Sequence, residues 1–371
     1  MNNHNENLTL LLLTKDRFEF SKRWLEFVTL TRLQFPILIA DGSTHDLLRN
    51  EVKSSPSYLD IDYLHPGPDL TISHFISKTI LSLKSVRTKY TYMASDDDFF
   101  SSDVLMKSIN FLESNGDFVL CNGGALDFGL SVRPTLESSI FGQMRYVHRF
   151  GIFESYLEDD ISIRIDRYRK SNRSYWESVI RTDTLLKSWE KAAELEFTRY
   201  DSLEAFLNLY WLTQGKFMNL DNEILLFHQV HNNMISQTLE SDYVREFNKI
   251  WKLESRRIGD YIKSISGIDP FSCQDRETME EYAKSENLND STSYRKFVMF
   301  ISVLYKKIKY KIDERFNIEP KMVLSDLHLS EIVINQIKEI EEFLLIGKLK
   351  SSDRKSKRNK YRDSTIPNEI V

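Results

Sequence analysis

Three consecutive acidic residues, Asp96, Asp97 and Asp98, come one residue after the apolar run Tyr90–Ala94 ("YTYMA"). Neighbouring carboxylates repel one another, and a divalent cation turns that repulsion into a binding site. The triplet therefore predicts a metal site at the end of a buried strand. The alternative interpretation is an acidic turn that caps a helix predicted over residues 102–114.

Two other apolar runs of strand length also end in polar residues. Residues 8–13 ("LTLLLL") lead into "TKDR" at 14–17, and residues 37–40 ("ILIA") lead into Asp41 and "GST". Because the carboxyl ends of parallel strands meet at one edge of a sheet, these polar segments and the aspartate triplet are predicted to lie together.

The elements that must position these residues alternate between strands and helices. Apolar runs without alternation favour strands that are covered on both faces, and the βαβ order favours a mostly parallel sheet. Strands are predicted at 8–13, 37–40, 58–64, 90–94, 117–121, 175–180 and 217–233, and helices at 18–33, 70–87, 102–114, 182–195 and 199–215. Residues 125–174 are predicted to be an irregular loop region.

The segments "LTLLLLTKDR", "ILIADGS" and "YTYMASDDDFF", in this order and spacing, resemble the nucleotide-sugar half of GT-A glycosyltransferases. The most similar kind is the family 2-like group that builds bacterial surface polysaccharides. The resemblance is clear over residues 8–125 and weaker to about 235. It implies an α/β, Rossmann-like GT-A fold and transfer of a sugar from a nucleotide-sugar donor, with a UDP-sugar as first choice, to a glycan or lipid-linked acceptor.

The resemblance also implies a divalent cation, Mn²⁺ or Mg²⁺, which would offset the charge of the departing nucleotide diphosphate. Asp98 is the expected metal ligand, Asp96 is expected to contact the ribose or the metal, and Asp97 to point into the structure. His231, in "FHQVHNN", is a further candidate ligand, with a polar loop residue as the alternative.

Nucleotide-binding candidates lie at the other strand ends and on the predicted helix 70–87. Lys15 and Arg17 have the charge to meet phosphates, although a salt bridge within the turn is an equal alternative. Asp41 is expected to bind the base or ribose, or else to cap a helix, and Lys78 to contact the nucleotide or remain solvated. The set is Thr14, Lys15, Arg17, Asp41, Lys78 and Asp96.

A catalytic base is expected in the second half of the chain, because an inverting transfer needs a group that takes the acceptor's proton. Asp201 and Glu204 in "RYDSLEAF" are the candidates, and compensation of the helix dipole is the alternative. The adjacent Glu-Asp pair common in the family is missing. Trp176 and Glu177 are candidates for an acceptor-side wall, with core packing as the competing account for Trp176.

The chain divides into three predicted regions: a GT-A domain at 1–235, a helical region at 236–348 and a basic tail at 349–371 that is expected to be disordered. The stretch 295–312 has an apolar stripe with lysines at one end, which fits either a core helix or peripheral contact with an anionic membrane.

The composition of the chain limits the classes of protein and the locations to which it can belong. The formal charge of −5 argues against a nucleic-acid partner, and two cysteines far apart give no disulfide framework, which favours a cytoplasmic location. No apolar run reaches the ~18 residues of a membrane span, and the start of the chain is predicted to be a strand rather than a signal peptide. Two alternatives stay open. One is a sugar-nucleotide pyrophosphorylase, an enzyme that usually carries a glycine-rich loop after the first strand, whereas "TKDR" has no glycine. The other is an inactive GT-A scaffold.

Overall fold

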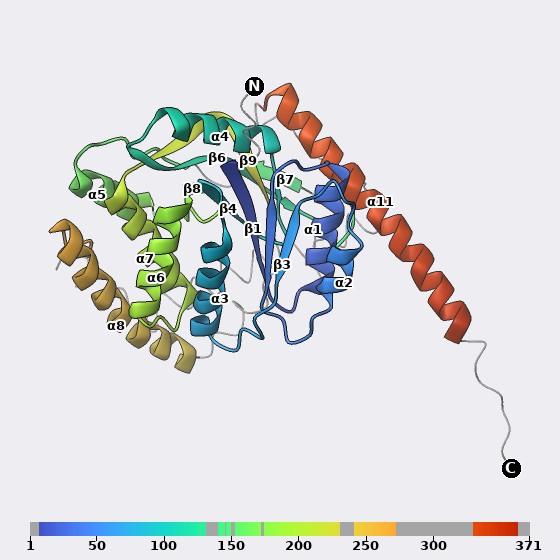
Figure 1. The fold of residues 1–371 in the computed structure, drawn as a ribbon, viewed down its shortest axis with the longest axis horizontal. Helices are drawn as coiled ribbons and strands as arrows, with labels where there is room; N and C mark the ends of the chain where they lie inside the picture. Colours follow the sequence, from blue (N-terminus) through green and yellow to red (C-terminus); the bar gives the residue numbers. More distant parts are fainter. Residues whose placement is uncertain are drawn as a thin grey trace, which may run out of the picture.

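The computed structural model describes residues 7–130, 140–144, 146–149, 153–171, 174–230, 241–271 and 329–362. Within these ranges the protein has an α/β fold in which helices flank a sheet, followed by a helical C-terminal part, as predicted (Figure 1). The strands are β1 (Leu8–Thr14), β2 (Ile37–Asp41), β3 (Ile61–Leu64), β4 (Tyr90–Ala94), β5 (Phe99–Phe100), β6 (Phe118–Gly129), β7 (Tyr146–Arg149), β8 (Val179–Arg181) and β9 (Lys216–Gln229).

The described strands form one nine-stranded sheet in the order β3-β2-β1-β4-β8-β6-β9-β5, with β7 paired to β6. The first four strands in this order are parallel. Strand β8 runs antiparallel to both β4 and β6 and so joins the parallel half to a mixed half. The parallel half sets the site, because the carboxyl ends of β1, β2 and β4 share one edge.

Helices cover both faces of the sheet (Figure 1). Along β1, Leu8, Leu10 and Leu12 join one apolar core while Leu11 joins the other, because successive side chains of a strand point to opposite faces. The first core packs against α1 (Phe18–Leu30), α2 (Leu48–Lys53), α4 (Ser102–Ser114) and α11 (Glu331–Arg362), and the second against α3 (Ile72–Ser85), α5 (Ile161–Ser171), α6 (Thr182–Glu194), α7 (Tyr200–Gln214) and α8 (Ser241–Ser266).

Two segments differ from the sequence-based expectation. The "NGG" at 122–124, which follows the strand predicted at 117–121, lies inside β6, where its pairing with β9 shifts register beside Gly123 and Gly124. A Cβ at Gly123 would lie 3.0 Å from the Leu225 backbone nitrogen, so a larger residue there would crowd the strand pair. The stretch 125–174, expected to be loop, contains the end of β6, β7 and helix α5.

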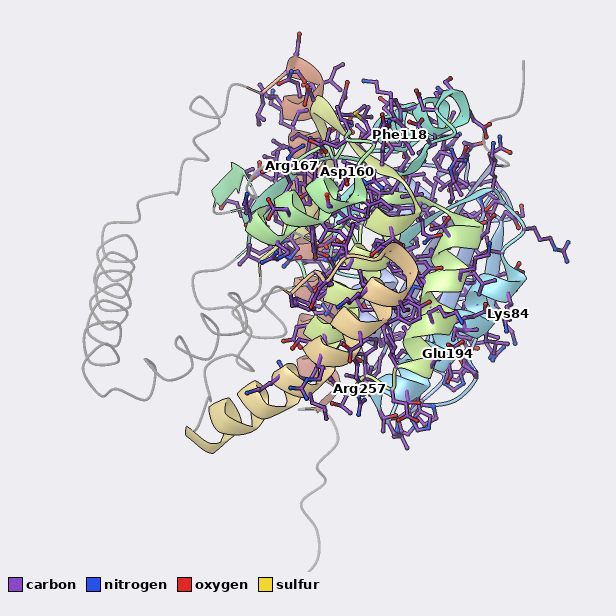
Figure 2. All side chains as sticks on the ribbon, turned by 90° about the vertical axis from the view of Figure 1, so that its left-hand side faces the viewer. Lys84, Phe118, Asp160, Arg167, Glu194 and Arg257 are labelled. Carbon is purple, nitrogen blue, oxygen red and sulfur yellow. The ribbon has the colours of Figure 1, made fainter. Side chains whose placement is uncertain are left out.

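The described C-terminal helices lie on opposite sides of the molecule (Figure 1). Helix α8 packs outside α6 and α7, where Arg257 donates hydrogen bonds to the carbonyls of Leu195 and Glu196, close to Glu194 at the end of α6 (Figure 2). Helix α11 packs on the α1 side and continues past residue 348, where the sequence predicts a separate tail. The stretch 295–312 lies outside the described residues.

Candidate functional site

A pocket of about 220 Å³ opens at the carboxyl ends of β1 and β4. Its walls come from four segments: the end of β1, the aspartate triplet, helix α3 with the turn before it, and the first residue of α7. The lining residues are Leu13, Thr14, Lys15, Arg17, Asp69, Phe75, Lys78, Ser95, Asp96, Asp97 and Tyr200. The structure therefore brings together all the nucleotide-binding candidates except Asp41.

Asp96 is buried at the floor of this pocket and is held by β1 and α1. Its Oδ2 accepts hydrogen bonds from the hydroxyls of Thr14 (2.8 Å) and Ser21 (3.3 Å), and its Oδ1 lies 3.1 Å from Arg17 Nε. Burial raises the pKa of Asp96 to about 6, although the Arg17 charge opposes the rise. The carboxylate is thus held in a fixed position by three side chains.

Asp97 does not point away from the site as expected, because its carboxylate lines the pocket and pairs with Arg17 Nη2 at 2.6 Å. Its backbone carbonyl accepts a hydrogen bond from Arg23 Nη2 at 2.7 Å. The Arg23 Nη1 atom donates to Gln229 Oε1 at 2.7 Å, and the side chain is fully buried beside the Phe99 ring. Arg23 therefore ties the triplet to the end of β9.

Asp98 is equally buried but does not line the pocket. Its Oδ1 accepts a hydrogen bond from the Gln229 backbone N–H at 2.8 Å, whereas Oδ2 accepts none within the described part of the chain. Burial raises the pKa of Asp98 well above its usual range, and the charge of Asp97 adds to the rise.

A second group of titratable side chains surrounds Asp98. Glu177 accepts a hydrogen bond from Ser95 at 3.1 Å, which links it to the pocket, and burial raises its pKa to about 7. The Nδ1 atom of His228 lies 2.8 Å from Asp127 Oδ1. Burial alone would lower the pKa of His228, but Asp127, Asp98 and Glu177 outweigh it and raise that pKa to about 9.

The predicted metal ligands can be compared with this geometry. Among the described residues, no group of three or more His, Cys, Asp or Glu side chains is arranged to hold a metal ion. His231 lies outside those residues. Mg²⁺ and related cations, however, commonly take one or two carboxylates and complete their shell with phosphates and water. The donor chemistry of Asp96 fits such a cation, as does that of Asp98 Oδ2, which accepts no hydrogen bond from the residues that the structure describes.

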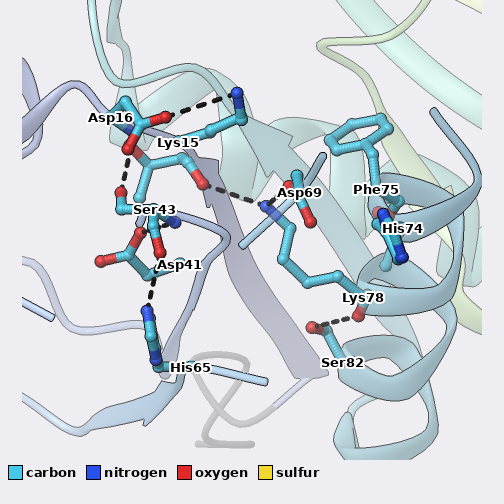
Figure 3. Close-up of polar contacts among 12 residues, drawn as sticks. Lys15, Asp16, Asp41, Ser43, His65, Asp69, His74, Phe75, Lys78 and Ser82 are labelled. Carbon is cyan, nitrogen blue, oxygen red and sulfur yellow. Dashed lines mark hydrogen bonds and ion pairs between the residues drawn. The ribbon is translucent and has the colours of Figure 1, made fainter. Parts of the chain in front are cut away.

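Lys78 is a buried residue and not a solvated lysine (Figure 3). Its Nζ donates to the Thr14 carbonyl at 3.0 Å and pairs with Asp69 Oδ2 at 2.6 Å. Burial lowers the pKa of Lys78, and the Asp69 carboxylate opposes that shift. Lys15, in contrast, is exposed, and its pairing with Asp16 at 3.4 Å leaves it at the pocket rim.

Asp41 is occupied by the chain itself. Its Oδ1 accepts the Ser43 N–H at 2.8 Å, and its Oδ2 lies 2.8 Å from the Tyr63 hydroxyl. The residue is 1% exposed and does not line the pocket. The "TKDR" and "DGST" loops are joined next to it, because Asp16 bonds to Ser43 and to the Thr44 N–H (Figure 3). Asp41 thus holds these loops in place.

The two base candidates lie in different surroundings. Asp201 forms a two-point ion pair with Arg199, at 2.9 and 2.7 Å. Glu204, one turn further along α7, is partly buried, and that burial raises its pKa. The charge of Glu204 adds to the rise in the pKa of Glu177. Trp176 stacks on Phe75, with ring centroids 6.3 Å apart, beside the pocket.

Three residues at the site were not predicted from the sequence: Ser95, Asp69 and Tyr200. The pairing of His228 with Asp127 was not predicted either. Asp69 follows "PGP" and Tyr200 begins a helix, so the only local signal is a turn or a helix start. The positions of Asp69 beside Lys78 and of Tyr200 beside Phe75 depend on the packing of α3 against α6 and α7, which no local pattern specifies.

No protein-family model matches the chain, and no curated protein is similar in sequence. Among solved structures, residues 1–349 of S. aureus TarS align with 70% of this chain and 69% of that chain, at 12% identity and a TM-score of 0.43. The same fragment bound to UDP-GlcNAc aligns at 10% identity, with a TM-score of 0.41 and 69% and 72% coverage. Similarity of this extent assigns neither a family nor an activity.

Proposed function

We propose that the protein is a metal-dependent glycosyltransferase that moves a sugar from a nucleotide-sugar donor to a glycan or lipid-linked acceptor in surface-polysaccharide synthesis. One observation carries the proposal: a pocket at the carboxyl ends of parallel strands combines Lys15, Arg17 and Lys78 with the carboxylates of Asp96 and Asp97. Such strand ends are where open α/β sheets bind ligands, and cations beside carboxylates suit a diphosphate and its metal.

In this proposal Asp96 and Asp98 hold Mn²⁺ or Mg²⁺, with His231 as a further candidate ligand. The cation would supply positive charge that offsets the charge developing on the departing nucleoside diphosphate. Arg17 adds a second positive charge at the same place, because its side chain reaches both Asp96 and Asp97 and is 40% exposed at the pocket. Lys15, which is exposed at the rim and pairs with Asp16, would approach the phosphates from there.

The proposed acceptor site lies at the titratable side chains around Asp98. A general base takes the proton of the acceptor hydroxyl as that oxygen attacks the sugar, and a pKa near the working pH serves this role best. Glu204 and Asp201 are the proposed bases. Burial raises the pKa of the Glu204 carboxyl, whereas Arg199 holds Asp201 in an ion pair. Ser95 and Glu177 join the pocket to this group, so donor and acceptor would meet there.

We also propose that the donor is a UDP-sugar and that the protein is cytoplasmic, with peripheral contact at the inner face of the membrane. This location would suit a lipid-linked acceptor. Among the described residues, no helix is both long enough and apolar enough to cross a bilayer. The lysine-rich stretch 295–312, for which a core helix and membrane contact are the two alternatives, lies outside those residues.

Turnover of nucleotide sugars tests the proposal. The protein is incubated with a panel of nucleotide sugars and Mn²⁺, and the release of nucleoside diphosphate is measured with and without chelator. The wild type is expected to release nucleotide only with the metal. Asp98→Asn is expected to lose that release, while Asp166→Asn, an exposed carboxylate on α5, serves as the matched control.

Other outcomes would contradict the proposal. Formation of nucleoside triphosphate from nucleotide sugar and pyrophosphate would instead indicate a pyrophosphorylase. No turnover of any donor, with nucleotide binding retained, would favour an inactive scaffold. Full activity in Asp98→Asn would exclude the metal assignment.

A further inference from the structure

Helix α8 packs against α7, the helix whose first turns face the candidate site. It lies beyond residue 235, where the resemblance to GT-A enzymes ends, and its Ile258 and Ile262 are fully buried in the apolar core that α7 also lines. The start of α7 carries Tyr200, which lines the pocket, and Glu204. None of the described side chains of α8 lines the pocket, so any effect of α8 on the site must pass through α7.

Two polar side chains of α8 hold the connection between α6 and α7. Glu254 is 2% exposed, and its Oε1 accepts two hydrogen bonds from Thr198, one from the backbone N–H at 2.8 Å and one from the hydroxyl at 2.7 Å. Arg257, on the same face of α8, donates from Nη1 to the Leu195 carbonyl at 3.2 Å (Figure 2). The connection 195–199 is thus bound to α8 near both of its ends.

The start of α7 is not capped by its own N-cap residue. Arg199 occupies the N-cap position, and its side chain makes no capping hydrogen bond but pairs with Asp201. A helix start without a capping side chain leaves backbone N–H groups without partners and is less stable. Because Thr198 directly precedes Arg199, the hydrogen bonds to Glu254 fix the chain at the point where α7 begins.

A carboxylate is a costly side chain at this buried position. Glu254 Oε2 is buried and accepts no hydrogen bond from the residues that the structure describes. A buried polar atom without a partner destabilises a fold, and a buried charge does so more strongly. The other oxygen, Oε1, binds both donors of Thr198 at once. The side chain of Glu254 therefore specifies the position of the chain at Thr198 rather than adding to overall stability.

We propose that Glu254 is a positioning residue for the acceptor side of the site, because it holds Thr198 and thereby sets where Glu204 stands relative to the pocket. The inference rests on the proposed function, in which Glu204 is a proposed base. A base must lie within hydrogen-bond reach of the proton that it takes, and a displacement of about 1 Å can lower a rate about 10²-fold. The groups proposed to hold the diphosphate come from other segments, so Glu254 acts on turnover and not on diphosphate binding.

Hydrogen exchange of the full chain, measured by mass spectrometry, tests the positioning itself. Glu254→Ala is expected to exchange about tenfold faster than the wild type over residues 198–204, because hydrogen bonds to a charged group are lost. Glu254→Gln keeps an acceptor oxygen and is expected to exchange at the wild-type rate. Asp260→Ala, at an exposed carboxylate on the same helix, is the matched control and is expected to do the same. Thr198→Val, at an exposed residue that keeps its N–H, is expected to show an intermediate increase.

Kinetics and calorimetry separate positioning from a merely structural role. Glu254→Ala is expected to lower kcat for the nucleotide-sugar donor about tenfold and to leave the affinity for inorganic pyrophosphate with Mn²⁺ unchanged. Glu254→Gln is expected to restore kcat. In a Glu204→Gln background, Glu254→Ala is expected to cause no further loss, because a residue that acts through another is not additive with it.

The outcomes distinguish this inference from the proposed function. Wild-type exchange over 198–204 in both Glu254→Ala and Thr198→Val would overturn the positioning role, and so would an equal loss of kcat from Glu254→Ala with and without Glu204→Gln. If Glu254→Ala does not fold, Thr198→Val carries the same two comparisons. A wild type that turns over no nucleotide sugar would overturn the proposed function and with it the catalytic role of Glu254, whereas the exchange rates would still decide whether Glu254 holds the start of α7.

Discussion

The ring of Phe343, in the C-terminal helix α11, lies 6.0 Å from the ring of Phe99, the residue that directly follows the aspartate triplet. Phe343 also contacts Phe27 of α1 at 5.9 Å, and Gln336 donates a hydrogen bond to Ser101 at 2.8 Å. Helix α11 therefore packs directly behind the segment that carries Asp98. Helix α11 thus supports the site, although none of its described residues lines the pocket.

Phe343→Ala is therefore expected to destabilise the protein by about 3–5 kcal/mol, because it removes a buried aromatic side chain and leaves a cavity. Ile332→Ala on the same helix is the matched control, since Ile332 is 62% exposed while Phe343 is 8% exposed. Urea unfolding measures both variants. Equal losses of unfolding free energy in the two would contradict the packing of α11 against Phe99.

Gly42→Ala is expected to cost about 1–3 kcal/mol and to weaken nucleotide binding, because its methyl group would collide with the Asp69 carboxylate. Gly116→Ala is the control: no atom lies within 4 Å of a Cβ there, and the residue does not need positive φ. Thermal unfolding and UDP titration are measured for each. Unchanged UDP affinity in a folded Gly42→Ala variant would show that Asp69 need not be held in this position.

Much of this site was predictable because strand ends are a local signal. The runs before Thr14, Asp41 and Asp96 are apolar and short, and parallel strands place their carboxyl ends at one edge. What the sequence did not reveal depends on distant packing. The prediction for Asp41 did not include its hydrogen bond with the Tyr63 hydroxyl, because that contact depends on the pairing of β2 with β3.

The second half of the sheet was harder to predict for the same reason. Strand β8 has only three residues, Val179–Arg181, and its place between β4 and β6 is set by pairing across the chain. The "NGG" segment carries the composition of a turn, yet β9 pairs with it throughout. Local propensity was overridden there by long-range hydrogen bonding.

Glu204→Gln is expected to lower turnover about 10²-fold or more and to leave UDP affinity unchanged, because it removes a proton acceptor but no phosphate contact. Asp201→Asn is expected to have a smaller effect, since Arg199 already occupies that carboxylate. Steady-state kinetics over a range of pH measure both. A larger loss in Asp201→Asn would assign the base to Asp201, and normal turnover in both would place it elsewhere.

His228 is expected to make stability depend on pH. Its pKa in the folded protein is raised to about 9, against 6.5 for an ordinary histidine, so the folded state binds more protons between these values. The stabilisation is fully present below about pH 6.5 and is lost as the pH rises through 9. Urea unfolding at pH 6, 7.5 and 9 should show the advantage of the wild type over His228→Asn shrinking. An advantage that grows with pH would contradict the charged pairing with Asp127, Asp98 and Glu177.

The most direct test of the account is a crystal structure of the protein with UDP and Mn²⁺, in which manganese is located by its anomalous scattering. The account predicts a manganese peak within coordination distance of Asp98, with the diphosphate beside Arg17. A nucleotide bound outside this pocket, or manganese bound away from Asp96 and Asp98, would contradict it.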